Sequence, residues 1–250
     1  MQKQAHTLFD GFHAGDKVLI KINHNTAATY PASTDHLFLA FFIALLRAQG
    51  ITRIKVGDCS TVTRLPTRRV FDASGIYATL QGKAEIVCFD EGRWVTVPIR
   101  GEYLDHVTIP QCVNEADKII YLANCKTHWL ADFSLGMKLA VGFMHPHERY
   151  ALHRDHLREK IAEISLALRP DLTIIDARTA LITGGPDKGS TASGNTVLAG
   201  RDIIQTDMEA YRLLYKLKKA NGCAESFSAD PLDMGQFRHV KKLVEEGRWR

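Results

Sequence analysis

The sequence predicts a single α/β domain over residues 1–250, with a mostly parallel sheet, flanking helices and a mixed sheet edge. Three observations lead to this prediction. The chain has 250 residues, of which 45% are hydrophobic and 24% charged, as is typical of one globular domain of this size. Between residues 17 and 57, a β-rich run, an apolar helical run and a second β-rich run follow one another. Later β-rich runs again end in polar loops.

The first three elements predict a βαβ unit. Residues 17–23 form the first expected strand and 52–57 the second, with the apolar helix 37–46 between them. Strands joined in this way are expected to be parallel. Their carboxyl ends, at Asn23 and Asp58, then lie at one edge of the sheet. Open α/β sheets bind their ligands at this edge.

The rest of the chain repeats strands and helices. Further strands are expected at 84–89, 117–122, 172–176 and 196–199, and helices at 67–75, 155–168 and 207–220. We expect 196–199 to be a core strand and 90–101 to form a hairpin. A narrowing near residues 102–109 would divide the domain into two lobes. The polar tail, residues 231–250, is expected to be a helix on the surface.

Charge and cysteine content narrow the class of function. The net charge of +4 does not require nucleic acid as a partner, but it favours an anionic ligand where positive groups converge. Five cysteines without a CxxC pair predict neither a disulfide framework nor a self-contained iron–sulfur or zinc site. The longest apolar run, 37–46, is too short to span a bilayer, and residues 1–9 do not form a secretory signal. We therefore expect a cytoplasmic protein without a membrane partner.

Polar and basic side chains follow four of the expected strands. Because parallel strands end at the same sheet edge, we predict that these side chains bind a small anionic ligand there. Taken singly, an Asn or Asp at such a position is also a common turn or capping residue. The predicted substrate-binding residues are Lys21, Asn23, Asn25, Asp58, Lys126, Thr127, Arg149 and Asp176.

Three further residues are predicted to be catalytic: His128, Lys138 and His153. His128 follows Lys126 in a loop, where a cation and an acid/base group can face one anion. Lys138 lies in an apolar segment, where loss of water lowers the pKa of an amine and makes it nucleophilic; alternatively, it reaches solvent from a helix rim. His153 is also a candidate metal ligand, since residues 145–156 contain four histidines. A solvated, histidine-rich helix start is the other interpretation.

The order of these motifs resembles the domain-of-unknown-function family 362, over residues 18–214. The resemblance includes Lys21-Ile-Asn23, Val56-Gly-Asp58, Lys126-Thr-His128, Met137-Lys138 and Ala151-Leu-His153. Members of that family are often fused to ferredoxin-like modules with four-iron clusters, which implies redox metabolism and an iron–sulfur redox partner. This chain has no CxxCxxC motif, and the usual Lys-Asn pair is Lys138-Leu139 here.

A more distant similarity is to the nickel-dependent lactate racemase family. In that family a histidine precedes the lysine that anchors a nickel-pincer nucleotide, and a later histidine ligates the metal. Here His128 precedes Lys138 by ten residues, and His153 follows. The similarity implies that Lys138 anchors the cofactor, that His128 is an acid/base and that His153 is a metal ligand or second base.

Together these observations predict an enzyme that acts on a small anionic metabolite at the carboxyl edge of the sheet. Proton transfer, isomerisation and a redox step all remain open, and a transition metal is compatible with the residues. Two alternatives remain: a non-catalytic accessory or cofactor-binding module that partners an iron–sulfur protein, and a lactate-racemase-like metal-dependent isomerase. Nucleic-acid binding through the basic tail, Lys241-Lys242 and 248–250, is a weaker hypothesis. The sequence does not specify an oligomeric state.

Overall fold

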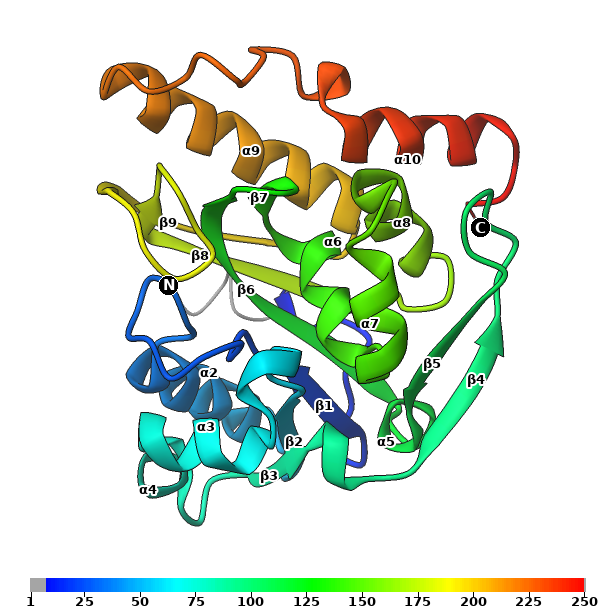
Figure 1. Cartoon of the computed structure of the whole chain (residues 1–250). Coiled ribbons are helices and arrows are strands. Elements are labelled where there is room, and N and C mark those ends of the chain that lie inside the picture. The colour runs from blue at the N-terminus through cyan, green and yellow to red at the C-terminus, as the bar shows by residue number, and fades with distance from the viewer. Residues whose placement is uncertain (1–7, 250) are drawn as a thin grey trace.

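The main sheet has seven strands and is mostly parallel, as the computed structural model shows for residues 8–249 (Figure 1). Its order is β3-β2-β1-β6-β8-β9, with β7 paired to β6 off this path. The strands are β1 (Lys17–Lys21), β2 (Arg53–Asp58), β3 (Glu85–Cys88), β6 (Lys118–His128), β7 (Asp132–Ser134), β8 (Leu172–Leu181) and β9 (Thr191–Gly200). Only β7 and β9 pair antiparallel to their neighbours. The predicted fold class, including the mixed edge, is confirmed.

Helices cover both faces of the sheet. They are α2 (His36–Ala48), α3 (Thr67–Ser74), α4 (Ile76–Leu80), α5 (Gln111–Asn114), α6 (Gly136–Leu139), α7 (Pro146–Leu152), α8 (Leu157–Ile164), α9 (Ile203–Ala220) and α10 (Gly235–Glu245), with 3-10 turns η1 (Val62–Arg64), η2 (Phe89–Glu91), η3 (Ala140–Phe143) and η4 (Pro231–Asp233). None of the helices in the described residues is long and apolar enough to cross a membrane.

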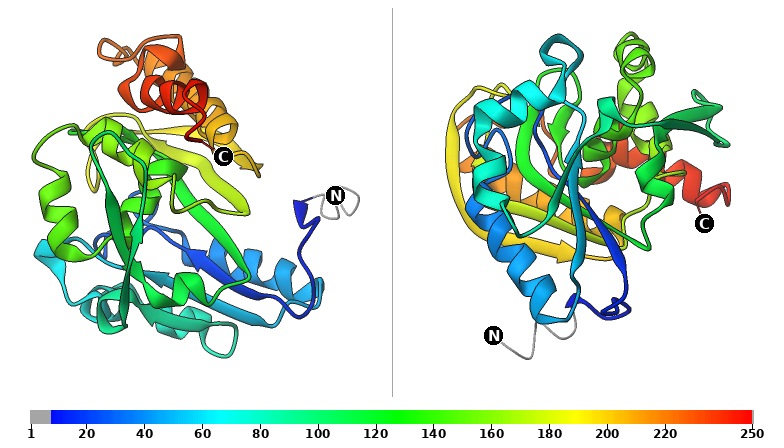
Figure 2. Two further views of the ribbon diagram at one scale, coloured as in Figure 1. Left: turned by 90° about the vertical axis from the view of Figure 1, so that its right-hand side faces the viewer. Right: turned by 90° about the horizontal axis from the view of Figure 1, so that it is seen from below.

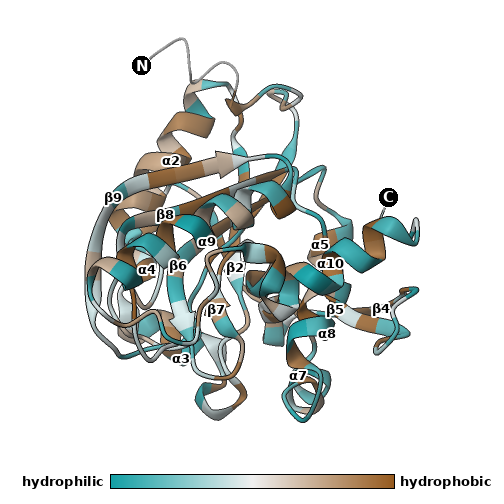
Figure 3. Cartoon of the chain, turned by 90° about the horizontal axis from the view of Figure 1, so that it is seen from above, coloured by the Kyte–Doolittle hydropathy of each residue, from teal (hydrophilic) through white to brown (hydrophobic). Residues whose placement is uncertain are grey.

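The alternation of side chains along β1 divides the core in two. Val18 and Ile20 pack with α2, α3 and α4, whereas Leu19 packs with α6 to α10 on the other face. The predicted βαβ unit is present, because β1 and β2 pair in parallel on either side of α2. Helix α2 begins at the N-cap Asp35, whose carboxylate accepts hydrogen bonds from the Leu37 and Phe38 N–H groups. Figure 3 shows α2 as predominantly hydrophobic.

The predicted hairpin lies further along the chain than residues 90–101. Strand β4 (Trp94–Pro98) pairs with β5 (His106–Pro110) in a separate two-stranded sheet, to one side of the main sheet (Figure 2). The loop between them is fixed by the buried carboxylate of Glu163, which accepts hydrogen bonds from the N–H groups of residues 102–104. Residues 102–109 are therefore hairpin loop and second strand; the division into lobes stays a prediction.

Two other elements differ from expectation. The expected core strand 196–199 lies within β9, an edge strand whose residues alternate between exposed and half-buried, so one of its faces is open. Helix α9 begins at Ile203, four residues before the expected start, because the N-cap carboxylate of Asp202 accepts the Ile204 and Gln205 N–H groups. The C-terminal tail contains α10, which packs against α8.

Candidate functional site

A cavity of ≈ 620 Å³ opens at the carboxyl ends of β1 and β6. We call it the edge cavity. Seven of the eleven predicted site residues line it: Lys21, Asn23, Asn25, His128, Lys138, Arg149 and His153. Asp58, Lys126, Thr127 and Asp176 are not part of its wall. A second cavity, of ≈ 590 Å³, lies at the opposite, amino ends of β1 and β2 and contains none of these residues.

Lys138 lies on α6 and is only 8% exposed. Burial, together with the positive charges of Lys126 and Arg149, lowers the pKa of its amine to about 7. No carboxylate contributes to this shift, and no hydrogen bond to Nζ forms within residues 8–249. The side chain lines the edge cavity, so the structure favours an unpaired amine at the cavity wall over a lysine that reaches bulk solvent.

The short helix that carries Lys138 is held by Asp207 of α9. The Gly136 and Met137 N–H groups donate to the two carboxylate oxygens at 2.8 Å each. A Cβ on Gly136 would lie 2.7 Å from Asp207 Oδ1 and 2.9 Å from Thr173 Cγ2, so a glycine is required there. Burial raises the pKa of Asp207 to about 7. Sequence patterns place Asp207 at the start of α9; instead it is inside that helix and positions α6.

His128 ends β6 in a neutral state with a defined tautomer. Its Nδ1 accepts hydrogen bonds from the Leu130 and Ala131 N–H groups, at 3.2 Å each, which assigns the ring hydrogen to Nε2. Burial, followed by the charges of Lys138 and Lys126, lowers the pKa of the ring to about 2. The ring is therefore a hydrogen-bond donor through Nε2 and a poor base.

His153, at the end of α7, has the opposite tautomer. Its Nδ1 is 2.7 Å from the Arg149 carbonyl oxygen, and because a carbonyl only accepts, Nδ1 carries the hydrogen. Nε2 is then left with its lone pair. Burial lowers the pKa of the ring, and the charges of Lys138 and Arg149 act in the same direction. One histidine of the cavity thus donates from Nε2 and the other accepts.

Arg149 is a positioning residue in this structure. Its Nη1 and Nη2 atoms donate to the Cys59 and Ser60 carbonyl oxygens at 2.6 Å each, and so tie α7 to the end of β2. Its buried Nε has no hydrogen-bond partner within the described residues. Two of its three guanidinium nitrogens are therefore engaged by backbone carbonyls, and its role in orienting an anion stays a prediction.

Lys21 and Asp58 form a buried ion pair at 2.6 Å, with both side chains 1% exposed. Asp58 also accepts hydrogen bonds from the His24 and Cys59 N–H groups. Gly142 packs directly on the pair: a Cβ there would overlap Lys21 Nζ and lie 2.6 Å from Asp58 Oδ1. The charge of Lys21 is therefore compensated although the residue lines the cavity.

Lys126 and Thr127 are directed into the protein beside the cavity. Lys126 Nζ donates to the Ala32 carbonyl at 2.6 Å and the Pro186 carbonyl at 3.2 Å, which ties two loops together. Burial lowers the pKa of Lys126 to about 8. The Thr127 hydroxyl is buried and has no hydrogen-bond partner in the part of the chain that the structure describes.

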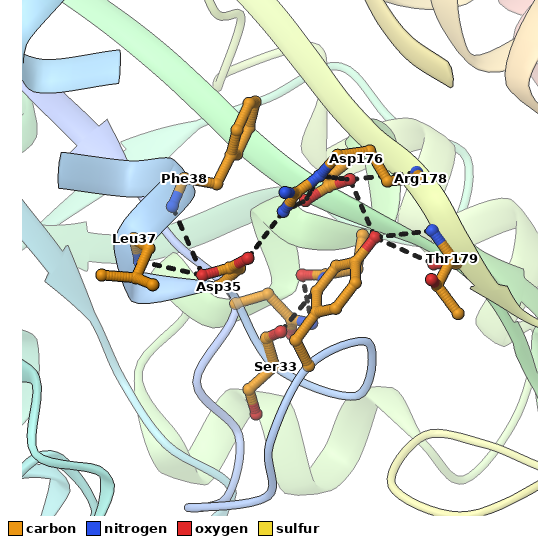
Figure 4. Close-up of polar contacts among 10 residues, drawn as sticks. Ser33, Asp35, Leu37, Phe38, Asp176, Arg178 and Thr179 are labelled. Atoms are coloured by element: carbon orange, nitrogen blue, oxygen red, sulfur yellow. Dashed lines mark hydrogen bonds and ion pairs between the residues drawn. The ribbon is translucent and has the colours of Figure 1, made fainter. Parts of the chain in front are cut away.

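Asp176 belongs to a separate cluster, which we call the Arg178 clamp: Tyr30, Asp35, Asp176 and Arg178. Figure 4 labels Asp35, Asp176 and Arg178 of this clamp. Arg178 Nη2 lies 2.8 Å from Asp176 Oδ2 and 2.7 Å from Asp35 Oδ2. The Tyr30 hydroxyl is 2.9 Å from Asp176 Oδ1. Both carboxylate oxygens of Asp176 are therefore occupied, which leaves no evident acceptor for a ligand.

The electrostatics of the edge cavity favour an anion. Its basic lining residues are Lys21, Arg64, Lys138, Arg149 and Arg154, and its acidic lining residue is Asp187. Sequence reasoning missed Arg64 and Arg154, because neither follows a strand or belongs to a motif. Apolar side chains form the mouth, with Trp129 71% and Tyr150 65% exposed.

A metal ion held by protein ligands alone does not fit this donor set. Within residues 8–249, no group of three or more His, Cys, Asp or Glu side chains is arranged to hold one. The two cavity histidines are surrounded by cations, whose repulsion opposes a divalent ion. The metal-ligand role predicted for His153 would therefore require a bound cofactor that itself carries the metal.

The family model described as Domain of unknown function (DUF362) matches residues 18–212. The chain belongs to this family. The family predicted from the motif order is thus confirmed, with nearly the same bounds. No curated protein matches this DUF362 chain.

Two solved structures show what the DUF362 chain is similar to. A Thermotoga maritima protein from a structural genomics programme has a TM-score of 0.51 and 12% identity, covering 88% of this chain and 58% of that one. The lactate racemase apoprotein from Thermoanaerobacterium thermosaccharolyticum has a TM-score of 0.47 and 13% identity, covering 84% and 54%. The chain therefore spans a little over half the length of these proteins. At such identity the first likeness concerns the fold alone.

Proposed function

We propose that this DUF362 protein is an enzyme that binds a small carboxylate or phosphate metabolite in the edge cavity and moves a proton on it. The observation that carries the proposal is the pair of opposite histidine tautomers beside an unpaired lysine. His128 offers a hydrogen, His153 offers a lone pair, and Lys138 offers an amine with a pKa of about 7. These are complementary groups for proton transfer near neutral pH.

The excess of basic side chains supplies binding. The charge of Lys21 is compensated by Asp58, so Arg64, Arg154 and Lys138 are the basic residues left to attract an anion. Lys138 is buried, where screening by water is weak, whereas Arg64 and Arg154 are exposed and their charges are screened more strongly.

The histidines supply the chemistry. The His128 Nε2–H would donate to a carbonyl or hydroxyl oxygen and stabilise negative charge that develops on it. A neutral imidazole suits this role, since it stays uncharged at any physiological pH when its pKa is about 2. His153 Nε2 would accept the proton from the neighbouring carbon or oxygen. Isomerisation by proton transfer at a carbon next to a carboxylate is the reaction class that these roles support.

Hydrogen exchange tests the proposal. Pyruvate, D-lactate, L-lactate and 3-phosphoglycerate are incubated separately with the protein in D2O, and loss of carbon-bound hydrogen is followed by proton NMR. We expect exchange in at least one compound, reduced roughly 100-fold or more in His153→Gln, because a general base contributes about that much. The matched control is His147→Gln: His147 is on the same helix, exposed and outside the cavity wall, so exchange should be unchanged.

A binding measurement separates the accessory-module alternative. Trp129, at the cavity mouth, reports ligand entry by fluorescence, and Trp129→Phe identifies its signal. Binding of an anion without exchange in any compound would contradict the enzyme and favour a non-catalytic module. The absence of both would remove the edge cavity as the functional site. The iron–sulfur redox partner stays a prediction.

A lactate-racemase-like, metal-dependent isomerase is a second candidate function. One observation favours it: the three residues that this resemblance marks, His128, Lys138 and His153, line one cavity. Lys138 would hold the organic cofactor through its amine, and His153 Nε2 would be the protein ligand; the cofactor would supply the metal centre. Protein purified from its native host would then contain nickel and a mass adduct missing from Lys138→Met. Unmodified, metal-free protein would exclude this candidate.

A further inference from the structure

We infer that Lys138 forms an imine with the carbonyl carbon of a small oxo acid bound in the edge cavity. This inference rests on the proposed function, because it takes the edge cavity as the anion site. It adds a substrate class, a carboxylate that also carries a ketone or aldehyde, and a covalent role for one side chain.

The four buried lysines of residues 8–249 carry the argument, because three of them have an oxygen partner and one has none. Lys21 Nζ pairs with Asp58 at 2.6 Å, and Lys126 Nζ donates to Ala32 O at 2.6 Å. Lys218 Nζ donates to the Ile182 carbonyl at 2.7 Å. Lys138 is also buried, at 8% exposed, and lines the edge cavity, but its Nζ has no such acceptor in the described residues. A buried amine without a partner is costly unless a ligand uses it.

The surroundings of Lys138 keep its amine in the nucleophilic form. An ammonium group has no lone pair, so attack on a carbonyl needs the neutral amine. Lys126 and Arg149 repel a third positive charge, and no carboxylate offsets them. With a pKa of about 7, half of the Lys138 side chains are neutral at pH 7, compared with well under 1% for an ordinary lysine, whose pKa is about 10.4.

The step balances without any further reactant. The amine nitrogen adds to the carbonyl carbon, and the resulting carbinolamine loses its oxygen as water, which carries away both amine hydrogens. A proton from solvent then gives the iminium ion. His128 lines the cavity, and its Nε2–H would donate a hydrogen bond to the departing oxygen. His153 Nε2 would be the base that accepts a proton from the adjacent carbon. The carboxylate of the oxo acid offsets the iminium charge among the neighbouring cations.

Reductive trapping tests the inference. The protein is incubated with pyruvate, acetoacetate or 2-oxoglutarate, reduced with sodium borohydride, digested and mapped by mass spectrometry. We expect a reduced adduct on Lys138 at pH 7 that exceeds the adduct on exposed Lys241 by more than about tenfold, because far more of its amine is neutral. Lactate, which lacks the carbonyl, should give no adduct. An unreduced sample shows any group already attached.

The pH profile and two variants complete the test. Trapping on Lys138 should rise through pH 7 and level off, whereas trapping on exposed lysines should keep rising toward pH 10. Lys138→Met should lose the adduct, and Lys138→Arg should lose it while keeping a cation for binding. Because the adduct is located by mass spectrometry on the wild-type protein, the test holds even if both variants fold poorly. No adduct with any of the three acids, or equal labelling of Lys138 and Lys241, overturns the inference.

The two proposals fail in different ways. Hydrogen exchange and anion binding without a trapped adduct would leave the proton-transfer function in place and remove the imine. A trapped adduct without exchange in the proton NMR experiment would keep the imine and remove proton transfer at carbon as the function.

Discussion

The edge cavity lies at the carboxyl ends of β1 and β6, and the Arg178 clamp includes two residues within β8 of the same sheet, yet charges are arranged in opposite ways in the two regions. In the clamp, one guanidinium is shared between the carboxylates of Asp35 and Asp176. In the cavity, the amine of Lys138 has neither a carboxylate nor a hydrogen-bond partner within the described residues. Paired charges stabilise a fold, whereas an unpaired buried charge lowers stability and becomes available to a ligand. The difference separates structural from functional polar residues.

The Lys21–Asp58 pair gives the most severe test of this comparison, because Lys21 lines the cavity but its charge is compensated by Asp58. Lys21→Met removes one partner of a pair that is 1% exposed on both sides. We expect the free energy of unfolding to fall by about 3–5 kcal/mol, since Asp58 keeps its charge in a buried place. Urea denaturation of the variant measures this. A loss below 1 kcal/mol would show that the pair is not a structural element.

Gly142→Ala perturbs the same pair without changing any charge. The added methyl would overlap Lys21 Nζ and crowd Asp58 Oδ1, so the pair or the η3 backbone must shift. We expect a loss of about 1–3 kcal/mol, as for other overpacked sites. Thermal unfolding of this variant beside Gly15→Ala, where nothing lies within 4 Å of the added methyl, isolates the effect of crowding. Equal melting temperatures in the two variants would contradict it.

Arg178→Ala breaks the clamp. It leaves Asp176 with the Tyr30 hydroxyl and the residue-178 N–H as hydrogen-bond donors. Because Arg178 is 40% exposed and screened by water, we expect a loss of only about 1–2 kcal/mol. Anion binding, followed through Trp129 fluorescence, should not change. A large loss of binding would place the clamp in the functional site.

Lys138→Met should change stability with the opposite sign. The folded-state pKa of about 7 lies below the value for an unfolded lysine, about 10.4, so between these values the unfolded state binds more protons. The wild-type protein therefore gains stability as pH rises from 7 toward 10. The variant should be more stable than the wild-type protein at pH 7, and this advantage should shrink by pH 9. Urea denaturation at the two pH values measures it; an advantage that grows with pH would mean that the amine is paired.

Sequence patterns predict the parallel half of the fold well, because each βαβ signal is local. They place the end of β1 two residues too late, at Asn23 instead of Lys21, and the end of β2 at Asp58 correctly, and with them the sheet edge that holds the cavity. They misplace the second strand of the hairpin, because Glu163, 61 residues away from Glu102, fixes the hairpin loop. They also miss the exposure of β9, because it depends on the place of β9 at the edge of the sheet.

Within the site, residue type alone does not separate a free cation from a paired one. Both Lys126 and Lys138 are lysines close to apolar segments, but in the structure it is Lys126 whose Nζ donates hydrogen bonds to two loop carbonyl oxygens. The role of Asp207 could not be read either, because it caps α6 across a separation of about seventy residues. Asp176, by contrast, is only two residues from its partner Arg178, so this contact joins neighbours in the sequence.

The opposite tautomers of His128 and His153 also give the edge cavity a handedness. His128 Nε2 donates a hydrogen bond, His153 Nε2 accepts one, and Lys138 supplies a third, chemically different point of attachment. Three unlike points that are not in line distinguish a tetrahedral carbon from its mirror image. A ligand that engages all three is bound as one enantiomer, and a flat intermediate is approached from one face only.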